Sequence, residues 1–275
     1  MTEADKAGES GFRVKRGWMG LSIAEIRDET PDTKTFIFVD PETGGRAFDY
    51  RAGQYLTFRY DTIAAKPIVR SYTMSSAPVD GDFAAVTVKR VEGGVVSNWM
   101  CDTLKVGDVL RARGPIGKFV YEPQNDESKL VFVAAGSGVT PFLSIMKEYS
   151  AHRKVTEVKG SSKPVELVLL VSFRTPGDII CAAELEELAR RPGVRVQITL
   201  SRVPESDPAA LQHPAFGQIW KGRITSEQLA AVCNDDFSAT TFFTCGPEDL
   251  MQGVAAFLKE QGVEEKNIKL ESFAS

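Results

Sequence analysis

Short apolar stretches separated by glycine and proline fill the first half of the chain, from about residue 20 to residue 121. Typical stretches are TKTFIFVD, QYLTFRY, AAVTVKRV and VLRARGPIGKFVY, which are rich in Val, Phe, Tyr and Thr. Short strands with frequent turns between them indicate a sandwich or a barrel. One stretch departs from this pattern, since VSNWMCDTL at 96–104 predicts a short helix with Ser97 as its N-cap. We therefore expect an antiparallel β-barrel domain over residues 20–122.

The pattern changes at the polar segment EPQNDESK, residues 122–129, which we interpret as the domain boundary. Apolar runs such as LVFVAA, VELVLLVSF, VRVQITLS and ATTFFTC then alternate with the helical segments FLSIMKEYSAHR, AAELEELARR, TSEQLAAVC and EDLMQGVAAFLKEQG. Near-continuous apolar runs are typical of strands buried on both faces. Their alternation with helices predicts an α/β doubly wound parallel sheet over residues 123–275, which ends with the strand IKLESF. The polar residues 1–19 are expected to form a flexible lead-in.

Composition adds constraints on chemistry and compartment. The chain has 275 residues, enough for two domains, and 43% of them are hydrophobic. No apolar run approaches the ~18 residues of a membrane span, and the amino end lacks an apolar signal core. The cysteines, Cys101, Cys181, Cys233 and Cys245, lack the close spacing of a zinc or iron–sulfur site. We therefore expect a cytoplasmic protein that holds no metal of its own.

Charge is unevenly distributed along the chain. The formal net charge is −4 at pH 7, yet residues 51–121 hold ten Lys or Arg against six Asp or Glu. This surplus leaves two interpretations open, an anionic ligand or partner of the β domain, or scatter over a solvated surface.

A glycine-rich turn follows the first apolar run of the second half, in VFVAAGSGVTPF. Gly136 and Gly138 allow backbone to approach a ligand closely, and Pro141 suits the first position of a helix with Thr140 as its N-cap. The amino end of a helix attracts phosphate. The pattern G-x-G-x-x-G is incomplete, because Pro141 stands in place of the third glycine. The strand–turn–helix context nevertheless favours a nucleotide site over a plain turn.

A second strand-to-helix turn, in FFTCGPEDLM, repeats this arrangement. Cys245, Gly246 and Pro247 follow an apolar run at the edge where doubly wound sheets bind ligands. Cys245 also has a plain alternative interpretation, as a small buried hydrophobic residue.

The segment RSYTMSS, residues 70–76, crowds one arginine, one tyrosine and four hydroxyl side chains into seven positions. Alone it predicts an ordinary strand, since tyrosine and threonine favour strands. Alternation along that strand would put Ser71, Thr73 and Ser75 on one face. The meaning of this composition therefore depends on the motifs that follow.

Four motifs in fixed order carry a resemblance to a known family. RSYTMSS is followed by GVVSNW, then AAGSGVTP, then CGP with a terminal ESF. Together they closely resemble the ferredoxin–NADP reductase family, and more narrowly the reductases that serve oxygenases and related iron–sulfur carriers. The similarity extends over about residues 20–275, and the order of the motifs makes it specific.

The resemblance implies bound FAD. Arg70 would pair with a phosphate of the flavin nucleotide, Tyr72 would lie against the isoalloxazine ring, and Thr73 would hydrogen-bond near N5. The family motif G-x-x-S, met by Gly94 and Ser97, would place a helix amino end at the pyrophosphate. Two phosphate-directed motifs fit FAD better than FMN. The expected flavin residues are Arg70, Ser71, Tyr72, Thr73, Val88, Gly94, Val95, Val96 and Ser97.

The resemblance also implies NADPH or NADH as cosubstrate. Its hydride would reach the flavin from the crevice of the second domain, and flavin can release the two electrons singly. Ser201 and Arg202 favour NADPH, because the family's NADPH-dependent members have a similar pair near the 2′-phosphate, whereas Arg174 and Arg223 also occur in NADH-dependent relatives. The expected coenzyme residues are Gly136, Ser137, Gly138, Thr140, Arg174, Ser201, Arg202, Arg223, Cys245, Gly246 and Pro247.

Catalytic roles by this resemblance fall on Thr73, Cys245, Glu271 and Phe273. Cys245 would orient the nicotinamide without a covalent adduct. Phe273 would shield the flavin until nicotinamide displaces it, or would simply pack the end of the sheet. No catalytic acid or base is required, so His152 and His213, the only two histidines, are interpreted as surface residues.

The resemblance implies that the electron acceptor is a ferredoxin-like iron–sulfur protein or an oxygenase component. We expect this protein to be a monomer and to bind no nucleic acid. A basic rim of Lys66, Lys89, Arg90 and Lys118 would steer an acidic carrier. Two alternatives stay open. One is a nucleotide-binding regulatory subunit without turnover, against which the intact R-x-Y-T argues, and the other is a flavin reductase that releases reduced flavin. The sequence also leaves open whether a ferredoxin module follows Ser275.

Overall fold

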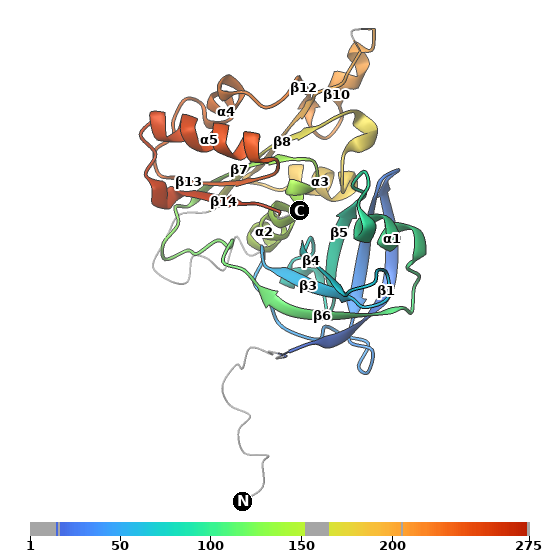
Figure 1. Cartoon of the computed structure of the whole chain (residues 1–275). Coiled ribbons are helices and arrows are strands. Elements are labelled where there is room, and N and C mark those ends of the chain that lie inside the picture. Colours follow the sequence, from blue (N-terminus) through green and yellow to red (C-terminus); the bar gives the residue numbers. More distant parts are fainter. Residues whose placement is uncertain (1–14, 16, 152–164, 205, 274–275) are drawn as a thin grey trace, which may run out of the picture.

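The computed structural model describes residue 15 and residues 17–151, 165–204 and 206–273, which form two sheet-based units (Figure 1). Most of the predicted lead-in and His152 lie outside these residues. Within them, no helix has the length and the apolar character needed to cross a membrane.

The first unit is an antiparallel sheet with the strand order β4-β3-β6-β1-β2-β5. Its strands are β1 (Met19–Thr30), β2 (Thr33–Val39), β3 (Tyr55–Tyr60), β4 (Ile68–Thr73), β5 (Ala84–Lys89) and β6 (Val109–Ile116). A bridge between Met74 and Val86 joins the end of β4 to β5, and this closes the sheet into the predicted barrel. Alternate residues such as Phe36, Phe38 and Phe58 point inward and are fully buried.

The helix predicted at 96–104 is present as α1 (Val95–Thr103), but its N-cap is Gly94 and not Ser97. A Cβ atom at Gly94 would meet the Ser97 Oγ at 2.8 Å and the Val91 carbonyl oxygen at 3.0 Å, so the tight approach favours glycine. Ser97 lies inside the first turn, where its hydroxyl accepts a hydrogen bond from the Val91 N–H at 3.1 Å. The predicted capping role of Ser97 is therefore wrong, and its side chain holds the preceding loop instead.

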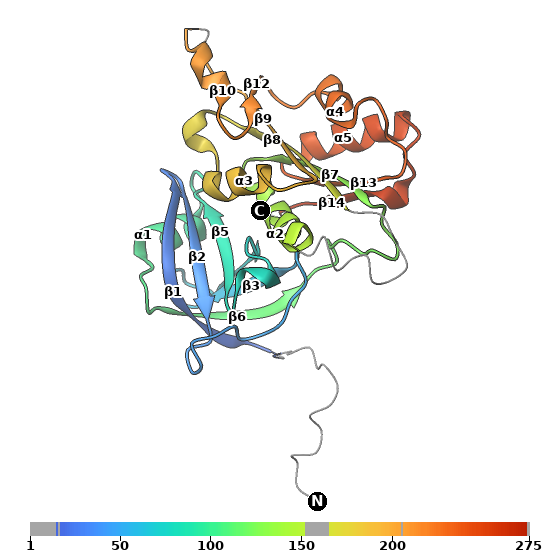
Figure 2. The same ribbon diagram turned by 180° about the vertical axis from the view of Figure 1, so that it is seen from behind.

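The second unit is a parallel sheet with the strand order β12-β9-β8-β7-β13-β14. Its strands are β7 (Lys129–Ala135), β8 (Glu166–Phe173), β9 (Val194–Leu200), β12 (Trp220–Lys221), β13 (Thr240–Cys245) and β14 (Ile268–Glu271). Helices α2 (Thr140–Ala151) and α3 (Ala182–Ala189) pack on one face, and α4 (Ser226–Cys233) and α5 (Glu248–Glu260) pack on the other (Figures 1 and 2). This is the predicted doubly wound sheet. The small hairpin of β10 (Gln212–His213) and β11 (Gly217–Gln218) was not predicted.

The strand order also locates the place where a ligand is expected. Successive strands β7, β8 and β9 run in one direction across the sheet, whereas β13 and β14 lie on the other side of β7. Connections on opposite sides of one strand leave a crevice at the carboxyl ends of β7 and β13. Both glycine-containing turns found in the sequence, after β7 and after β13, lie at this crevice.

The two units share a buried contact. Phe119 and Tyr121 of the first unit belong to the same apolar cluster as Phe142 of α2. Ser144 of α2 donates a hydrogen bond to the Ser76 carbonyl at 2.6 Å. These contacts hold α2, and the glycine-rich turn that precedes it, against the barrel.

Candidate functional site

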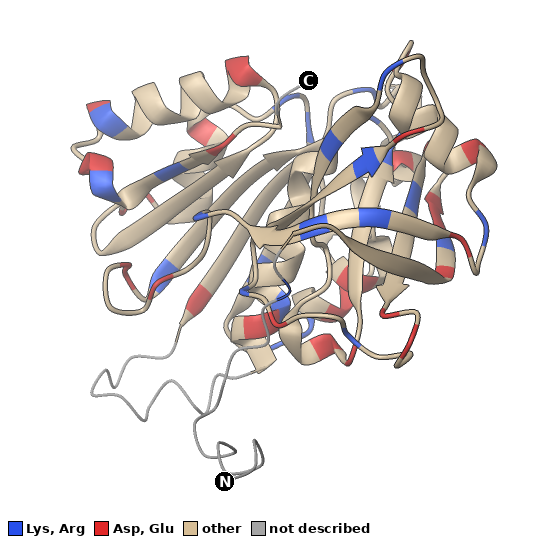
Figure 3. Cartoon of the chain, turned by 60° about the horizontal axis from the view of Figure 1, so that its bottom comes forward, with Lys and Arg blue, Asp and Glu red and all other residues tan. Residues whose placement is uncertain are grey.

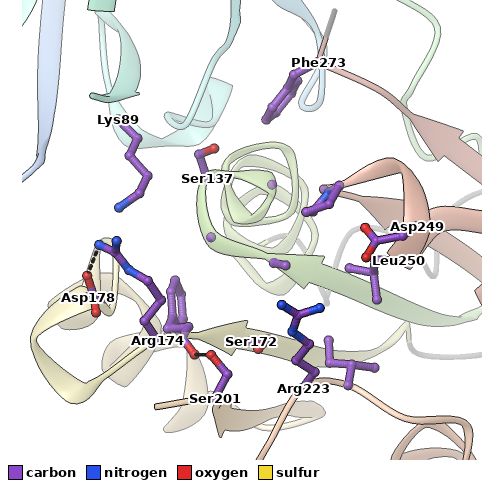
Figure 4. Close-up of a pocket in the computed structure, with 17 residues that line it drawn as sticks. Lys89, Ser137, Ser172, Arg174, Asp178, Ser201, Arg223, Asp249, Leu250 and Phe273 are labelled. Atoms are coloured by element: carbon purple, nitrogen blue, oxygen red, sulfur yellow. Dashed lines mark hydrogen bonds and ion pairs between the residues drawn. The ribbon is translucent and has the colours of Figure 1, made fainter. Parts of the chain in front are cut away.

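A cavity of about 740 Å³ lies at the carboxyl edge of the parallel sheet, and we call it the sheet-edge cavity (Figure 4). It brings together most of the residues that the sequence assigns to the coenzyme, which are Gly136, Ser137, Gly138, Arg174, Ser201, Arg223, Gly246 and Pro247. Sequence reasoning missed several further lining residues, among them Lys89, Ser172, Asp178 and Asp249. Lys89 comes from the barrel, so the cavity is built by both units.

A second cavity, of about 440 Å³, lies against β4, β5 and the amino end of α1, and we call it the barrel cavity. It is lined by nearly all of the predicted flavin residues, which are Arg70, Ser71, Tyr72, Thr73, Gly94, Val95, Val96 and Ser97. Val88 does not line it, because its side chain is fully buried in the barrel core. Thr140, predicted for the coenzyme, lines this cavity and not the sheet-edge cavity. Thr87, Lys89, Val91, Glu92 and Gly93 also line it and were not predicted.

The two cavities meet at Lys89, Ser137 and Phe273, which line both of them. Phe273 follows the last strand and is 40% exposed, and Figure 4 shows its ring at the border of the sheet-edge cavity. A third, smaller cavity of about 300 Å³, the side cavity, contains Glu271 and Phe273 together with Arg70. Burial raises the pKa of the Glu271 carboxyl. The carboxyl end of the described chain therefore stands at the junction of all three cavities.

The hydroxyl groups of RSYTMSS have separate partners. Ser71 and Thr57 are hydrogen-bonded at 2.9 Å across β4 and β3. Ser75 accepts a hydrogen bond at 2.8 Å from Thr87, a residue of β5 that lines the barrel cavity. Ser71 and Thr73 line both the barrel cavity and the side cavity, so these two share a face as alternation predicts, whereas Ser75 lies beyond the end of β4 at Thr73. The hydroxyl groups of Ser71 and Ser75 thus link β4 and the residues after it to β3 and β5.

The chain enters α2 through a short 3₁₀ turn, η2 (Gly136–Val139). Gly136 has a φ of +55°, a left-handed conformation that suits glycine. Thr140 already has helical angles, and its hydroxyl donates a hydrogen bond to the Ser137 carbonyl at 3.1 Å. The prediction that Thr140 is the N-cap is therefore wrong. The Gly-Ser-Gly turn is itself the first turn of the helix.

Gly138 is required by a contact with the protein's own backbone. A Cβ atom at this position would lie 2.2 Å from the carbonyl oxygen of Cys245 at the end of β13. The Cys245 side chain is fully buried and lines none of the three cavities, and burial raises the pKa of its thiol. In this structure Cys245 matches the plain alternative of a packed hydrophobic residue. Its role beside nicotinamide stays a prediction.

Charged side chains cross between the two units at the edge of the sheet-edge cavity. Lys89 of β5 donates to both oxygens of Asp32 at 2.7 and 2.6 Å. Arg174 donates to the same carboxylate at 2.9 Å and also to Asp178 (Figure 4). Burial opposes ionisation of Asp32, but the hydrogen bonds from Lys89 and the neighbouring threonines outweigh it and hold its pKa far below the usual value. Arg174 is therefore already engaged by two carboxylates.

The remaining predicted cations differ in how they are placed. Figure 4 shows Arg223 pointing into the sheet-edge cavity, whereas Arg202 is exposed and does not line it. Of the four cations proposed to steer a carrier, Lys89 is held by Asp32, and Arg90 pairs with Asp102 at 2.7 Å. Lys66 and Lys118 are exposed.

His213 is half-buried, and its ring stacks on Phe216 with the centroids 4.4 Å apart. Its side chain is 29% exposed, which is compatible with the predicted surface position. Among the residues that the structure describes, no group of three or more His, Cys, Asp or Glu side chains is arranged to hold a metal ion.

Comparison with protein-family models gives two matches that follow one another along the chain. The Oxidoreductase FAD-binding domain matches residues 21–121, and the Oxidoreductase NAD-binding domain matches residues 132–256. The barrel unit and the parallel-sheet unit therefore correspond to an FAD-binding and an NAD-binding domain in this order.

Curated relatives are similar over nearly the whole chain. The chain is 30% identical over 255 residues to the "3-ketosteroid-9-alpha-monooxygenase, ferredoxin reductase component" of Rhodococcus rhodochrous, covering 93% of this chain and 65% of that protein. It is also 30% identical over 286 residues to the component of the same name from Mycobacterium tuberculosis, covering 100% of this chain and 70% of that protein. The chain thus spans about two thirds of the length of these relatives.

A solved structure shows the same fold. The FAD/NAD-binding domain of nitric oxide dioxygenase from Vibrio cholerae superimposes with a TM-score of 0.75 at 23% identity, covering 94% of this chain and 99% of that one. At this identity the likeness concerns the fold alone.

Proposed function

The chain belongs to the ferredoxin–NADP reductase family, and from this membership we propose that it is an FAD-dependent reductase that takes a hydride from NAD(P)H and passes single electrons to a ferredoxin-like iron–sulfur protein or an oxygenase component. The observation that carries the proposal is the junction of the barrel cavity and the sheet-edge cavity. Two adjoining sites, one in each domain, let a flavin and a nicotinamide meet. The two relatives compared above are ferredoxin reductase components of a monooxygenase, which supports a reductase that serves such a partner.

The residues of the barrel cavity fit a flavin dinucleotide. Arg70 offers a fork of donors suited to phosphate, and the amino end of α1 lies on the same cavity. Tyr72 presents an aromatic ring that is half-buried against Phe58, with centroids 6.2 Å apart. We assign Arg70 and the α1 turn to the phosphates, and Tyr72 and Thr73 to the ring. When bound, FAD supplies the conversion of a hydride into two single electrons.

The sheet-edge cavity fits the coenzyme. The turns after β7 and β13 present backbone groups to its floor, and Arg223 points into it. We assign Phe273 to the border between the two ligands, where its ring covers the flavin site until nicotinamide takes its place. We keep residues 20–122 and 123–275 as the bounds of the two domains, and we propose that the protein acts as a cytoplasmic monomer.

The direct test of this function uses the purified protein. We expect yellow protein that keeps its colour through gel filtration, FAD on extraction, and bleaching of the flavin when NADPH or NADH is added without oxygen. Protein that stays colourless and inactive with added FAD would contradict the proposal. Flavin that is reduced but elutes separately from the protein would favour the flavin-reductase alternative.

We propose a preference for NADPH and assign the 2′-phosphate to Arg223, since Arg174 is already held by Asp32 and Asp178. Arg223→Ala is expected to weaken NADPH binding by roughly tenfold to a hundredfold, because a charge-assisted hydrogen bond to phosphate contributes ~1.5–3 kcal/mol. The affinity for NADH, which lacks the 2′-phosphate, should change much less. Dissociation constants from flavin-perturbation titrations with NADP⁺ and NAD⁺ would measure both effects.

Arg202→Ala is the matched control for this experiment. It removes the same charge from a side chain that does not line the sheet-edge cavity, so coenzyme selectivity should stay as in the wild type. If Arg202→Ala lost NADPH selectivity and Arg223→Ala kept it, the 2′-phosphate site would instead be Ser201 and Arg202, as the sequence suggested. Equal use of both coenzymes by all three proteins would rule out the preference.

A further inference from the structure

The carboxylate of Asp32 binds one cation from each unit at the edge of the sheet-edge cavity. Asp32 lies in the turn between β1 and β2 of the barrel. It accepts hydrogen bonds from Lys89 of the barrel, at 2.7 and 2.6 Å, and from Arg174 of the second unit, at 2.9 Å. Asp32 does not line the cavity, but both of its cationic partners do. Its charge therefore acts on two cations that face the ligand site.

The turn itself fixes Asp32 and helps to keep it charged. The hydroxyl groups of Thr30 and Thr33 donate to one oxygen of the carboxylate at 2.8 and 2.9 Å, and the Arg90 N–H donates to the Asp32 carbonyl at 2.7 Å. The Asp32 side chain is only 28% exposed. A partly buried charge is screened less by salt than an exposed one. Asp32 is therefore a permanent negative charge that neighbouring groups feel strongly.

The charges around the sheet-edge cavity are mixed in sign. Figure 3 shows Asp and Glu positions interspersed with Lys and Arg positions over both units. The charged residues that line the cavity are Lys89, Arg174, Arg223, Asp178 and Asp249. Figure 4 shows Lys89 and Arg174 extending toward each other from the two units, and Arg174 is paired with Asp178 as well as with Asp32. Two of the three lining cations are thus already balanced by carboxylates.

We propose that Asp32 limits how tightly the sheet-edge cavity holds the nicotinamide coenzyme, an inference that rests on the proposed function. The pyrophosphate of the coenzyme is an anion that binds through N–H donors and positive charge. Asp32 competes with it for the donors of Lys89 and Arg174, and its own charge repels the ligand. The 2′-phosphate of NADPH adds about two negative charges, so the opposition is larger for NADPH than for NADH. Asp32 therefore discriminates between coenzymes by their charge.

A limit on affinity suits a coenzyme that has to leave after each hydride transfer. Binding that stabilises substrate and product equally does not raise turnover once the coenzyme is saturating. Tightly held oxidised coenzyme would also block the site for the next reduced one. Asp32 reaches the ligand only through Lys89 and Arg174, so it is a positioning residue for these two cations and not a catalytic residue.

The test removes the charge of Asp32 while keeping its shape. Asp32→Asn is compared with Asp28→Asn, an equal charge change in the same hairpin. The Asp28 side chain is 80% exposed, pairs with Lys34 and lines none of the three cavities. Asp32→Glu keeps the charge but alters the packing, and Asp32→Ser is a second neutral variant. Dissociation constants for NADP⁺ and NAD⁺ come from flavin-perturbation titrations at low and high salt, with the FAD content and melting temperature of each protein.

Asp32→Asn should bind NADP⁺ at least ~5-fold more tightly than the wild type at low salt, and NAD⁺ by a smaller factor, and raised salt should shrink both gains. Asp32→Ser should show the same direction, whereas Asp28→Asn and Asp32→Glu should stay close to the wild type. Unchanged or weaker NADP⁺ binding in the neutral variants, with FAD retained, would overturn the proposal and leave Asp32 as a clamp between the units. Equal tightening in Asp28→Asn or Asp32→Glu would also overturn it. A wild-type protein that binds FAD but neither coenzyme would instead reject the proposed function.

Discussion

Replacing Arg70 by alanine is expected to weaken FAD binding by roughly tenfold to a hundredfold, so that the protein loses its yellow colour during purification. The estimate follows from ~1.5–3 kcal/mol for a charge-assisted hydrogen bond to phosphate. Arg70 lies on both the barrel cavity and the side cavity, and its guanidinium donates a hydrogen bond to the Val69 carbonyl at 2.9 Å. The FAD content after gel filtration and a fluorescence titration of flavin-free protein would measure the loss.

Two companion variants show whether the loss is specific to Arg70. Arg113→Ala removes the same charge from a nearby strand, but Arg113 lines neither the barrel cavity nor the side cavity, so FAD should be retained. Arg70→Lys keeps a point charge without the planar fork and should fall between Arg70→Ala and the wild type. If Arg70→Ala retained FAD as well as Arg113→Ala does, the phosphate would have to be held by α1 alone.

The fold was predictable because its signals are local and periodic. The near-continuous apolar runs of β7, β8 and β13 correctly predicted strands buried on both faces. The glycine-containing turns after β7 and β13 correctly predicted which edge of the sheet forms the cavity. The barrel followed from short strands rich in Val, Phe and Thr. These patterns depend on neighbours a few residues apart, which the sequence displays directly.

The capping errors have one physical cause. Ser97 and Thr140 are good capping residues by type, but the structure begins each helix earlier, at glycine-containing turns. The position of Gly94 depends on contacts with Val91 and Ser97, and that of Gly138 depends on a strand more than a hundred residues away. Propensity names residues that can cap a helix, whereas packing decides which one does.

The charged groups were the least predictable part of the site. Lys89 and Arg174 were chosen as free cations, yet both are bound by Asp32, which lies in the turn between β1 and β2. No periodic pattern links Asp32 to Arg174.

Gly138→Ala is expected to damage the coenzyme site while leaving FAD in place. Its Cβ atom would lie 2.2 Å from the Cys245 carbonyl oxygen, 2.7 Å from the carbonyl carbon and 3.0 Å from the Gly246 nitrogen. All three are backbone atoms, so no side-chain rotation relieves the conflict. Overpacking of this kind costs ~1–3 kcal/mol. We expect a melting temperature several degrees lower, measured by circular dichroism. NADP⁺ affinity should fall by at least ~10-fold, because the turn that must shift to relieve the clash also lines the sheet-edge cavity.

Gly253→Ala provides the opposite expectation within the same unit. Gly253 lies in α5, and a Cβ atom there meets nothing within 4 Å. Alanine should therefore stabilise the helix by up to ~1 kcal/mol and leave coenzyme affinity unchanged. FAD content should be normal in both variants, because the barrel cavity draws its phosphate-facing residues from β4 and α1. A Gly138→Ala variant with the melting temperature and the NADP⁺ affinity of the wild type would contradict this prediction. It would mean that the turns after β7 and β13 can move apart at little cost, so that the packing of Gly138 on Cys245 does not determine the shape of the site.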